Sequence, residues 1–288
     1  MRNWKPLKTR VGRIWLLLAA GELFAHAESL SVPGLADIPA REVRIFLPAA
    51  GVTPTTPVLV ALDGQSMKEW RLEQALAAVA AGGRLASPLV VAIPAGGDRL
   101  NEYGMAQSPD FAGRGRKAEE FQRFVIEAVL PAIRTRYGLT ADPVRTGIMG
   151  ASLGGLAAFD LAWRHPETFG FVGVFSGSFW WRSDNASPAA QQASRLAHQR
   201  VRSTPQPPRL RLWFEAGTRD ETDDRDGNGV IDAIQDTTEL VAELEKRGFA
   251  RGSHLKYVEI PGGEHNEATW AGALPGFLDW ALPPVARK

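Results

Sequence analysis

The chain has 288 residues, of which 44% are hydrophobic and 23% are charged, and its formal net charge is +1. This ordinary globular composition excludes a disordered chain, a collagen-like chain and a coiled coil. No basic stripe is present, and no apolar run reaches the roughly 18 residues of a bilayer-spanning helix. The sequence therefore predicts neither a nucleic-acid partner nor a stable membrane span. Cysteine is absent, which excludes disulfides, thiolate metal sites and a cysteine nucleophile.

The first 27 residues have the pattern of an export signal. Basic residues from Arg2 to Arg13 precede a short apolar stretch at 14–21, and Ala25-His26-Ala27 has the small residues of a cleavage site. The apolar stretch is too short to span a bilayer. We therefore expect a signal peptide over 1–27, a periplasmic or secreted protein, and one domain over 28–288.

Apolar strands and amphipathic helices alternate along the rest of the chain. Short apolar runs that end at turn residues predict strands, and apolar side chains at helical spacing predict helices. The expected strands cover 43–47, 57–62, 88–93, 144–149, 171–175, 210–214 and 255–260, and the expected helices cover 69–81, 118–137, 153–164, 237–247 and 267–282. This alternation predicts an α/β fold with a mostly parallel central sheet and helices on both faces.

Two places depart from the simple alternation. Pro131 lies inside the expected helix at 118–137 and should kink or break it, because proline has no backbone N–H to donate. The polar segment at 177–208 is interpreted as an insertion or a lid rather than as a second domain.

The residues from Gly150 to Gly154 have the G-x-S-x-G pattern of a nucleophile at a sharp strand-to-helix turn. A predicted strand leads into this segment and a predicted helix leaves it, which is the context that the pattern requires. The flanking glycines allow neighbouring backbone to approach closely. A turn of small residues without chemistry is the alternative, but the context favours Ser152 as a nucleophile.

A serine nucleophile needs a histidine base and an acid that orients the histidine. In α/β folds with this turn, the acid and then the histidine follow the serine along the chain. His265 follows the last predicted strand, where such a fold collects its site residues, so it is the expected base. Asp220 follows the strand at 210–214 and is the expected acid, with Glu221 as the alternative.

Two backbone N–H groups are needed to stabilise the negative charge that develops on the carbonyl oxygen of the substrate. Leu153 supplies one of them, because it directly follows the nucleophile. The other should come from a loop after an earlier strand, and the amide of Gln65 is the candidate.

Several further side chains are candidates for contact with a substrate. Trp180 and Trp181 are adjacent and cannot both point into one core, so one of them should face the site. Trp270 follows the expected base, and Arg99 and Glu102 follow the strand at 88–93. Core packing of the tryptophans and a plain ion pair of Arg99 and Glu102 are the alternatives.

A second motif resembles the first nine positions of a calcium-binding loop. Oxygen-bearing side chains at alternating positions around a glycine turn suit a hard cation. In this chain these side chains belong to Asp224, Asp226, Asn228 and Asp232. Gln235 occupies the twelfth position, where a carboxylate is usual, and the flanking helix pair is missing. A structural Ca²⁺ is thus one hypothesis and an Asp-rich surface turn is the other, while catalysis is expected to need no cofactor.

Six segments resemble one known family: LDGQS (62–66), RLNEY (99–103), GASLGG (150–155), SGSFWW (176–181), AGTRDE (216–221) and GGEHN (262–266). They are similar to the Putative esterase family of α/β-hydrolases over about residues 40–282. Its members include ferric enterobactin esterases, feruloyl and acetylxylan esterases, S-formylglutathione hydrolases and mycolyltransferases. The resemblance implies an α/β-hydrolase fold and a triad of Ser152, Asp220 and His265. The SGSFWW and RLNEY segments resemble the enterobactin-esterase branch.

The sequence therefore predicts an exported serine carboxylic ester hydrolase that forms an acyl-enzyme and acts on a small-molecule or carbohydrate-linked ester. A siderophore trilactone esterase is one alternative, and an acyltransferase that uses the same acyl-enzyme is another. A non-catalytic binding protein is disfavoured because all three triad residue types are present in order, although a fold alone would not imply chemistry.

Overall fold

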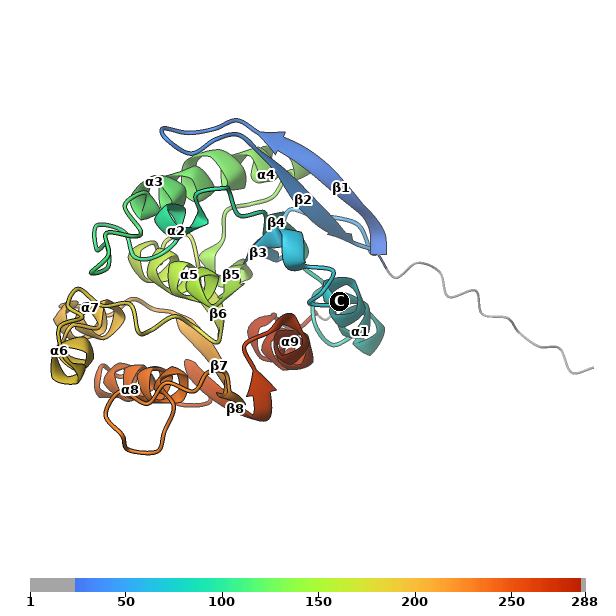
Figure 1. Ribbon diagram of the computed structural model, residues 1–288. Helices are drawn as coiled ribbons and strands as arrows, with labels where there is room; N and C mark the ends of the chain where they lie inside the picture. The colour runs from blue at the N-terminus through green and yellow to red at the C-terminus, as the bar shows by residue number, and fades with distance from the viewer. Residues whose placement is uncertain (1–23, 286–288) are drawn as a thin grey trace, which may run out of the picture.

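The computed structural model describes residues 24–285 of the chain. The expected signal peptide lies outside these residues except for its last four positions. Eight strands form one sheet in the order β1-β2-β4-β3-β5-β6-β7-β8 (Figure 1). Strands β3 to β8 are parallel to one another, whereas β2 is antiparallel to both of its neighbours, β1 and β4. The expected mostly parallel α/β sheet is confirmed.

The strands agree with the sequence pattern and extend it at both ends of the chain. Their bounds are β1 (Phe24–Val32), β2 (Arg41–Pro48), β3 (Val58–Leu62), β4 (Leu89–Ile93), β5 (Thr146–Ala151), β6 (Phe171–Phe175), β7 (Arg211–Arg219) and β8 (Leu255–Glu264). Strand β1 has no counterpart in the sequence prediction, and it includes the expected cleavage position at Ala27. Cleavage there would leave Glu28–Val32 paired with β2.

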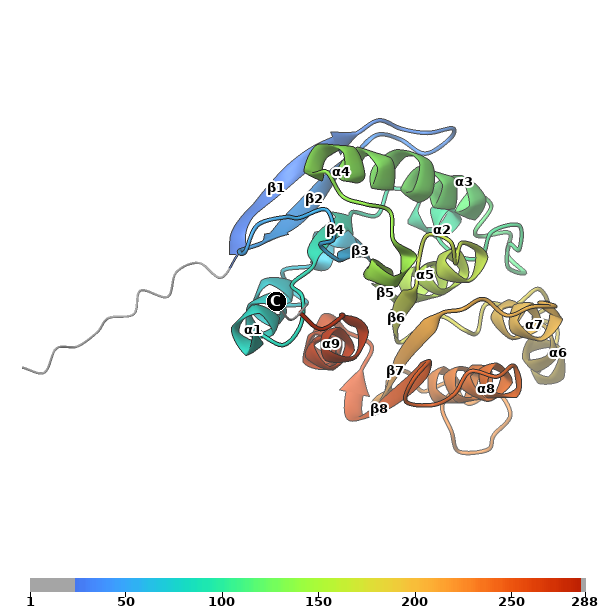
Figure 2. The same cartoon turned by 180° about the vertical axis from the view of Figure 1, so that it is seen from behind.

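Helices cover both faces of the sheet (Figures 1 and 2). Their bounds are α1 (Leu72–Gly82), α2 (Arg99–Glu102), α3 (Ala118–Arg123), α4 (Leu130–Tyr137), α5 (Leu153–Arg164), α6 (Pro188–Ala193), α7 (Leu196–Ser203), α8 (Asp232–Lys246) and α9 (Glu267–Ala281). Helices α1 and α9 lie on one face, and α3, α4, α5 and α8 lie on the other. Within residues 24–285, none of the helices combines the length and the apolar character needed to cross a bilayer.

The expected break at Pro131 is absent, because a π-helical segment joins α3 to α4. This segment covers Phe124–Val129, and at its end the N–H of Leu130 donates to the carbonyl oxygen of Val125. Pro131 follows Leu130 at the end of this segment, so the N–H that proline lacks falls where the α-helical hydrogen-bond pattern is already interrupted. The proline therefore changes the hydrogen-bond pattern of the helix without ending it.

Two apolar layers, one on each face, hold the sheet rigid. Every residue of β3, β4, β5 and β6 is buried, as expected for parallel strands covered on both sides. Beneath α1 and α9 the layer is rich in aromatic rings, including Trp70, Phe175, Trp213 and Phe277. The carboxyl ends of these strands, where loops leave the sheet, are thus fixed in position.

The polar segment at 177–208, which the sequence analysis interpreted as an insertion or a lid, contains α6 and α7. These helices pack beside α8 (Figure 1). The side chain of Arg195, between these two helices, forms a buried ion pair with Asp236 and a partly exposed one with Glu239, both on α8. The segment is therefore a fixed wall above the carboxyl ends of the strands.

Candidate active site

Ser152 occupies the turn between β5 and α5 in a strained backbone conformation. Its φ is 55° and its ψ is −127°, a combination that costs energy for a residue with a side chain. The turn is tight because a Cβ on Gly150 would lie 2.4 Å from the carbonyl oxygen of Gly154. The N–H of Ser152 donates to the carbonyl oxygen of Phe175 at 2.9 Å, which ties the turn to β6. The sequence thus holds a serine at the start of α5, on the carboxyl edge of the sheet.

His265 and Asp220 meet at the same edge because β7 and β8 are neighbouring parallel strands. Asp220 directly follows β7, and His265 lies between β8 and the Asn266 side chain that caps α9. The Nδ1 of His265 is 3.5 Å from the Oδ1 of Asp220. The Asp220 side chain is fully buried, whereas that of His265 is 41% exposed. The pair therefore presents an imidazole to solvent with a buried carboxylate behind it.

Ser176, which the sequence analysis did not single out, and Trp270, which it named only as a substrate contact, hold the acid in place. The hydroxyl of Ser176 donates to Oδ1 of Asp220 at 3.0 Å, and the Nε1 of Trp270 donates to that hydroxyl at 2.9 Å. Ser176 directly follows β6, within the segment 176–181 that carried part of the family resemblance. Nothing in the sequence of this segment indicated that Ser176 lies beside the expected acid.

The hydroxyl of Ser152 lies 3.5 Å from the hydroxyl of Ser178. Among the described residues it forms no hydrogen bond with His265, so the base must approach it when a substrate binds. Such contacts are commonly long in free enzymes and shorten in the substrate complex. A hollow of about 30 Å³ beside His265 is lined partly by Ser176, Ser178 and Trp180.

The two candidate oxyanion amides are available. Neither the N–H of Leu153 nor that of Gln65 has a hydrogen-bond acceptor within residues 24–285. The Gln65 side chain is fixed, because its Oε1 accepts the N–H of Ala95 at 2.9 Å and its Nε2 donates to Asp63 at 3.3 Å. Free N–H groups at a helix start and in a fixed loop are what an oxyanion requires.

Arg99 forms an ion pair, but its partner is Asp63 and not the Glu102 of the alternative interpretation. Its Nε and Nη2 donate to the two carboxylate oxygens of Asp63, each at 2.7 Å. Glu102 is only 2% exposed and pairs with Arg41 at 2.5 Å. The expectation that Glu102 contacts substrate is therefore corrected, since its carboxylate is buried and already paired.

The tryptophans divide between the site and the core. Trp180 lines the hollow beside His265, so one member of the adjacent pair does face the site. Trp181 is fully buried, and its Nε1 donates to the carbonyl oxygen of Ser108 at 3.0 Å. Trp270 is 8% exposed and its N–H is used by Ser176. The substrate-contact expectation is thus corrected for Trp181 and Trp270, because packing and hydrogen bonding occupy both.

A larger polar hollow of about 460 Å³ adjoins the hollow beside His265, and Trp180 and Glu221 line both. Carboxylates and arginines dominate the rest of its lining, namely Arg182, Asp223, Asp224, Arg225 and Asp232. Burial raises the pKa of Glu221 to about 7. This hollow offers polar contacts to whatever part of a ligand extends beyond His265.

The calcium-loop motif does not form a metal site among the described residues. Within 24–285, no group of three or more His, Cys, Asp or Glu side chains is arranged to hold a metal ion. Asp224 instead accepts the N–H groups of Asn228 and Gly229, at 3.1 and 2.8 Å. Asp232 accepts the N–H of Arg225 at 3.0 Å. The loop's own N–H groups thus use part of the accepting capacity of these carboxylates, and a structural Ca²⁺ stays a prediction.

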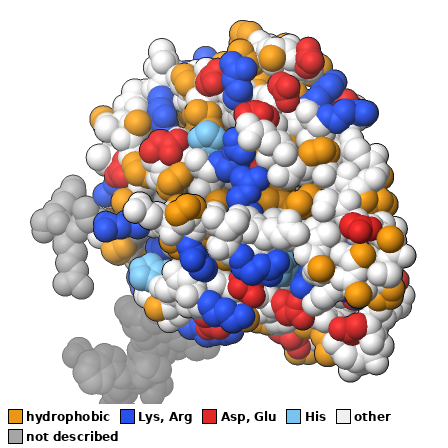
Figure 3. All heavy atoms as spheres, turned by 90° about the vertical axis from the view of Figure 1, so that its left-hand side faces the viewer, with side chains coloured by type: hydrophobic (Ala, Val, Ile, Leu, Met, Phe, Trp, Pro, Cys, Tyr) orange, Lys and Arg blue, Asp and Glu red, His pale blue; other side chains and the backbone are white. Residues whose placement is uncertain are grey.

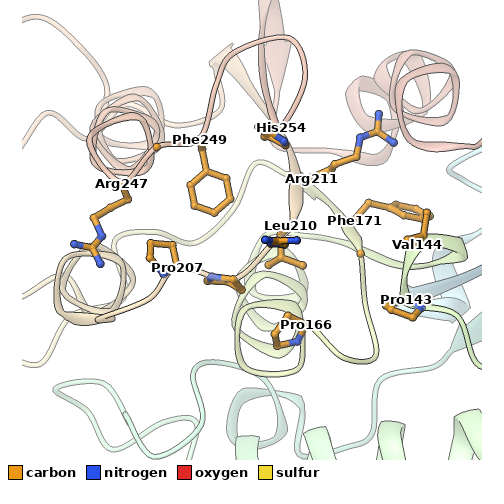
Figure 4. Close-up of a pocket in the computed structure, with 14 residues that line it drawn as sticks. Pro143, Val144, Pro166, Phe171, Pro207, Leu210, Arg211, Arg247, Phe249 and His254 are labelled. Atoms are coloured by element: carbon orange, nitrogen blue, oxygen red, sulfur yellow. The ribbon is translucent and has the colours of Figure 1, made fainter.

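A groove of about 710 Å³ lies far from the triad, at the amino ends of the parallel strands (Figure 4). Its lining includes Phe171 and Arg211, which begin β6 and β7, together with Phe249 and several prolines. In Figure 4 the side chain of Arg211 points away from Phe249, and it donates to the carbonyl oxygens of Trp280 and Ala281. None of the candidate catalytic residues lines this groove.

One face of the surface carries charges of both signs. On the face that forms the left-hand side of Figure 1, Lys and Arg side chains are interspersed with Asp and Glu (Figure 3). They do not merge into an uninterrupted basic surface on this face.

The fold and this site define the class of protein. Residues 39–281 match the family described as "Putative esterase", and the chain belongs to that family. It is thus a member of an esterase family and has the α/β-hydrolase fold.

Curated relatives fall into two groups. An uncharacterized protein of Bacillus subtilis, YbbA, is 22% identical over 83% of this chain and 92% of its own length. The iron(III) salmochelin esterase of Escherichia coli is 26% identical over 81% of this chain and 52% of its own length. The iron(III) enterobactin esterase of Dickeya dadantii is 26% identical over 83% of this chain. The chain spans about half the length of these two named esterases.

Solved structures share the fold. The enterobactin esterase of Shigella flexneri, crystallised in the presence of enterobactin, has a TM-score of 0.67 at 21% identity, over 88% of this chain and 58% of that one. A ferulic acid esterase has a TM-score of 0.65 at 17% identity, over 89% of this chain and 97% of that one. The second match shows that a chain of this length can carry the whole fold.

Proposed function

We propose that the chain is an exported serine carboxylic ester hydrolase that acts through Ser152, His265 and Asp220. The observation that carries the proposal is a strained serine at a strand-to-helix turn on the same sheet edge as a buried aspartate paired with a histidine. Membership of an esterase family supports the class of reaction.

In this mechanism the Oγ of Ser152 forms a bond to the ester carbonyl carbon while His265 takes the hydroxyl proton. Asp220 stabilises the resulting imidazolium. The carbonyl oxygen becomes an anion and accepts the N–H groups of Leu153 and Gln65. The bond to the leaving alcohol then breaks and the alcohol takes the proton from His265. Water repeats the sequence on the acyl-enzyme and releases the acid.

We propose a small-molecule or carbohydrate-linked ester as the substrate. The polar hollow beside Trp180 supports this choice, because its carboxylates and arginines can bind hydroxyl groups of the alcohol part. A siderophore ester is the second candidate, since four of the curated relatives are named as salmochelin or enterobactin esterases. A panel of acetyl, feruloyl and siderophore esters separates these candidates. Product analysis with an added sugar alcohol separates hydrolysis from acyl transfer by the same acyl-enzyme.

The test of the triad compares wild type with Ser152→Ala on p-nitrophenyl butyrate. We expect Ser152→Ala to lose at least about 10³-fold in kcat/KM, because the nucleophile is removed. Ser178→Ala is the matched control, since its hydroxyl is the neighbour of Ser152 but has no role in bond formation. Full activity in Ser152→Ala would contradict the proposal, as would failure of a fluorophosphonate to label Ser152.

Export is a separate part of the proposal. Expression of the whole chain in a bacterial host should release a protein whose first residue is Glu28, as determined by mass spectrometry of the exported fraction. A product that keeps residues 1–27 and stays in the cytoplasm would contradict it.

A further inference from the structure

Glu215 is a buried carboxyl that the mechanism above does not use. It lies on β7, its side chain is fully buried, and no side chain among the described residues forms a hydrogen bond with its carboxyl oxygens. The strand register pairs it with Phe175 on β6 and Val258 on β8, so it faces the aromatic layer beneath α9. Burial, with the charge of Asp220 as a lesser cause, raises the pKa of Glu215 to about 8, although the backbone N–H of Ser176 acts in the opposite direction.

Two other buried polar atoms, one on β7 and one directly after it, also lack hydrogen-bond partners among the described residues. One is the Oδ2 of Asp220, whose Oδ1 is the oxygen that faces His265 and Ser176. The other is the Nε1 of Trp213, which lies two residues before Glu215 on β7 and therefore on the same face of the sheet. Trp213 offers a donor and Asp220 offers an acceptor. A protonated carboxyl group can donate one hydrogen bond and accept others, whereas an ionised carboxylate can only accept.

We propose that Glu215 is a positioning residue for the triad, held as an uncharged carboxylic acid whose O–H is the donor available to Oδ2 of Asp220. This inference rests on the proposed function, because it assigns the second partner of the proposed acid. Asp220 is then held from two sides, by the Ser176 hydroxyl on Oδ1 and by Glu215 on Oδ2. The acid keeps its orientation toward His265 and remains the charged member of the carboxyl pair, so the imidazolium that forms during acyl transfer meets a fixed negative charge.

The surroundings of Glu215 favour the uncharged form. The titratable neighbours are Asp220, in the loop after its own strand, and Tyr257 on β8, whose pKa is raised by burial with the Glu215 charge as a lesser cause. Strand β6 and helix α9 contribute Phe175, Ser176 and Trp270, which do not titrate. No cationic side chain pairs with Glu215 among residues 24–285. An ionised Glu215 would face the Asp220 carboxylate without compensation.

The experiment compares Glu215→Gln with Glu215→Met. Gln keeps both a donor for Asp220 and an acceptor for Trp213, whereas Met keeps the volume and removes both. We expect Glu215→Gln to retain kcat within about threefold and Glu215→Met to lose about tenfold to a hundredfold in kcat with KM nearly unchanged. Glu215→Gln as inactive as Glu215→Met would overturn the proposal, because an ionised carboxylate would then be required.

A second measurement reports the protonation of Glu215 without relying on activity. A carboxyl whose pKa is about 8 when folded and near its ordinary 4.5 when unfolded binds a proton on folding between those values. Its contribution to the free energy of unfolding is therefore largest below the unfolded pKa and is lost as pH rises toward the folded one. The difference in Tm between Glu215→Gln and wild type should increase from about pH 5 to about pH 8. A constant difference would overturn the uncharged state.

The two readouts separate this inference from the proposed function. A wild-type protein without esterase activity would remove both the triad and the positioning role, even if the Tm difference still showed an uncharged Glu215. An active wild type with unchanged kcat in a folded Glu215→Met would leave the triad intact and remove only the role of Glu215.

Discussion

The two ends of the parallel strands carry hollows of very different size and chemistry. At the amino ends the groove of about 710 Å³ is walled by prolines, Leu210 and Phe249. At the carboxyl ends the hollow beside His265 is about 30 Å³, and the polar hollow that adjoins it is about 460 Å³. The small hollow nevertheless lies beside the strained serine, the buried aspartate and buried polar atoms without partners. Strained backbone and constrained polar groups thus indicate chemistry here, and cavity volume does not.

Among the variants that test this difference between the two ends of the sheet, Asp220→Asn is expected to have the largest effect on kcat. An amide in place of the acid would hold His265 in the wrong tautomer, so kcat should fall by about 10³-fold to 10⁴-fold. Glu221→Gln, at the alternative acid, should lower kcat by less than about tenfold. Steady-state kinetics on p-nitrophenyl butyrate measures both. A larger loss in Glu221→Gln would assign the acid to Glu221 instead.

A smaller loss is expected from Ser176→Ala. This change removes the hydroxyl that donates to Oδ1 of Asp220 and accepts from Trp270. One hydrogen bond to a charged group is lost, so kcat should fall by about tenfold while KM changes little. Ser178→Ala provides the comparison with a neighbouring hydroxyl that does not contact the acid. Equal losses in both variants would mean that Ser176 acts through general packing.

A change in the large groove should affect stability alone. Leu210 is 2% exposed and belongs to the apolar layer opposite α9. Leu210→Ala should reduce the free energy of unfolding by about 2–4 kcal/mol and leave kcat/KM unchanged at temperatures where the protein is folded. Urea denaturation and kinetics at 25 °C measure the two quantities. A loss of kcat/KM in the folded variant would show that the two ends of the sheet are coupled.

The sequence was sufficient where one local pattern decides one local structure. The apolar runs of β3 to β6 and the G-x-S-x-G turn are of this kind, because burial on both faces and the glycine positions act within a few residues. Partners that come from distant segments were not predictable. Glu102 resembled a site residue until the structure paired it with Arg41, and nothing near Ser176 indicated that its hydroxyl meets Asp220. Such contacts depend on which loops the strand order brings together.

The smallest effect concerns the Asp-rich loop, where the motif and the structure lead to opposite expectations. Gln235 stands where a calcium loop carries a bidentate carboxylate, and it instead donates to Asp226 at 2.9 Å and accepts from Asn228 at 3.0 Å. We therefore expect Ca²⁺ or EDTA to change the Tm of the wild type by less than about 1 °C.

Gln235→Glu supplies the carboxylate that is missing from the twelfth position. It tests whether this carboxylate is all that the loop needs to bind Ca²⁺. Its Tm should rise with Ca²⁺ by a few degrees at concentrations of about 100 times Kd, because binding to the folded state alone adds about 2.7 kcal/mol. Mg²⁺, which dehydrates reluctantly and demands a smaller octahedral site, is the control and should have little effect. A fall in the wild-type Tm on adding EDTA would instead show that the native loop binds a metal ion. The carboxyl end of β7 would then carry an ion as well as the triad acid, and the loop after Asp220 would depend on it for order.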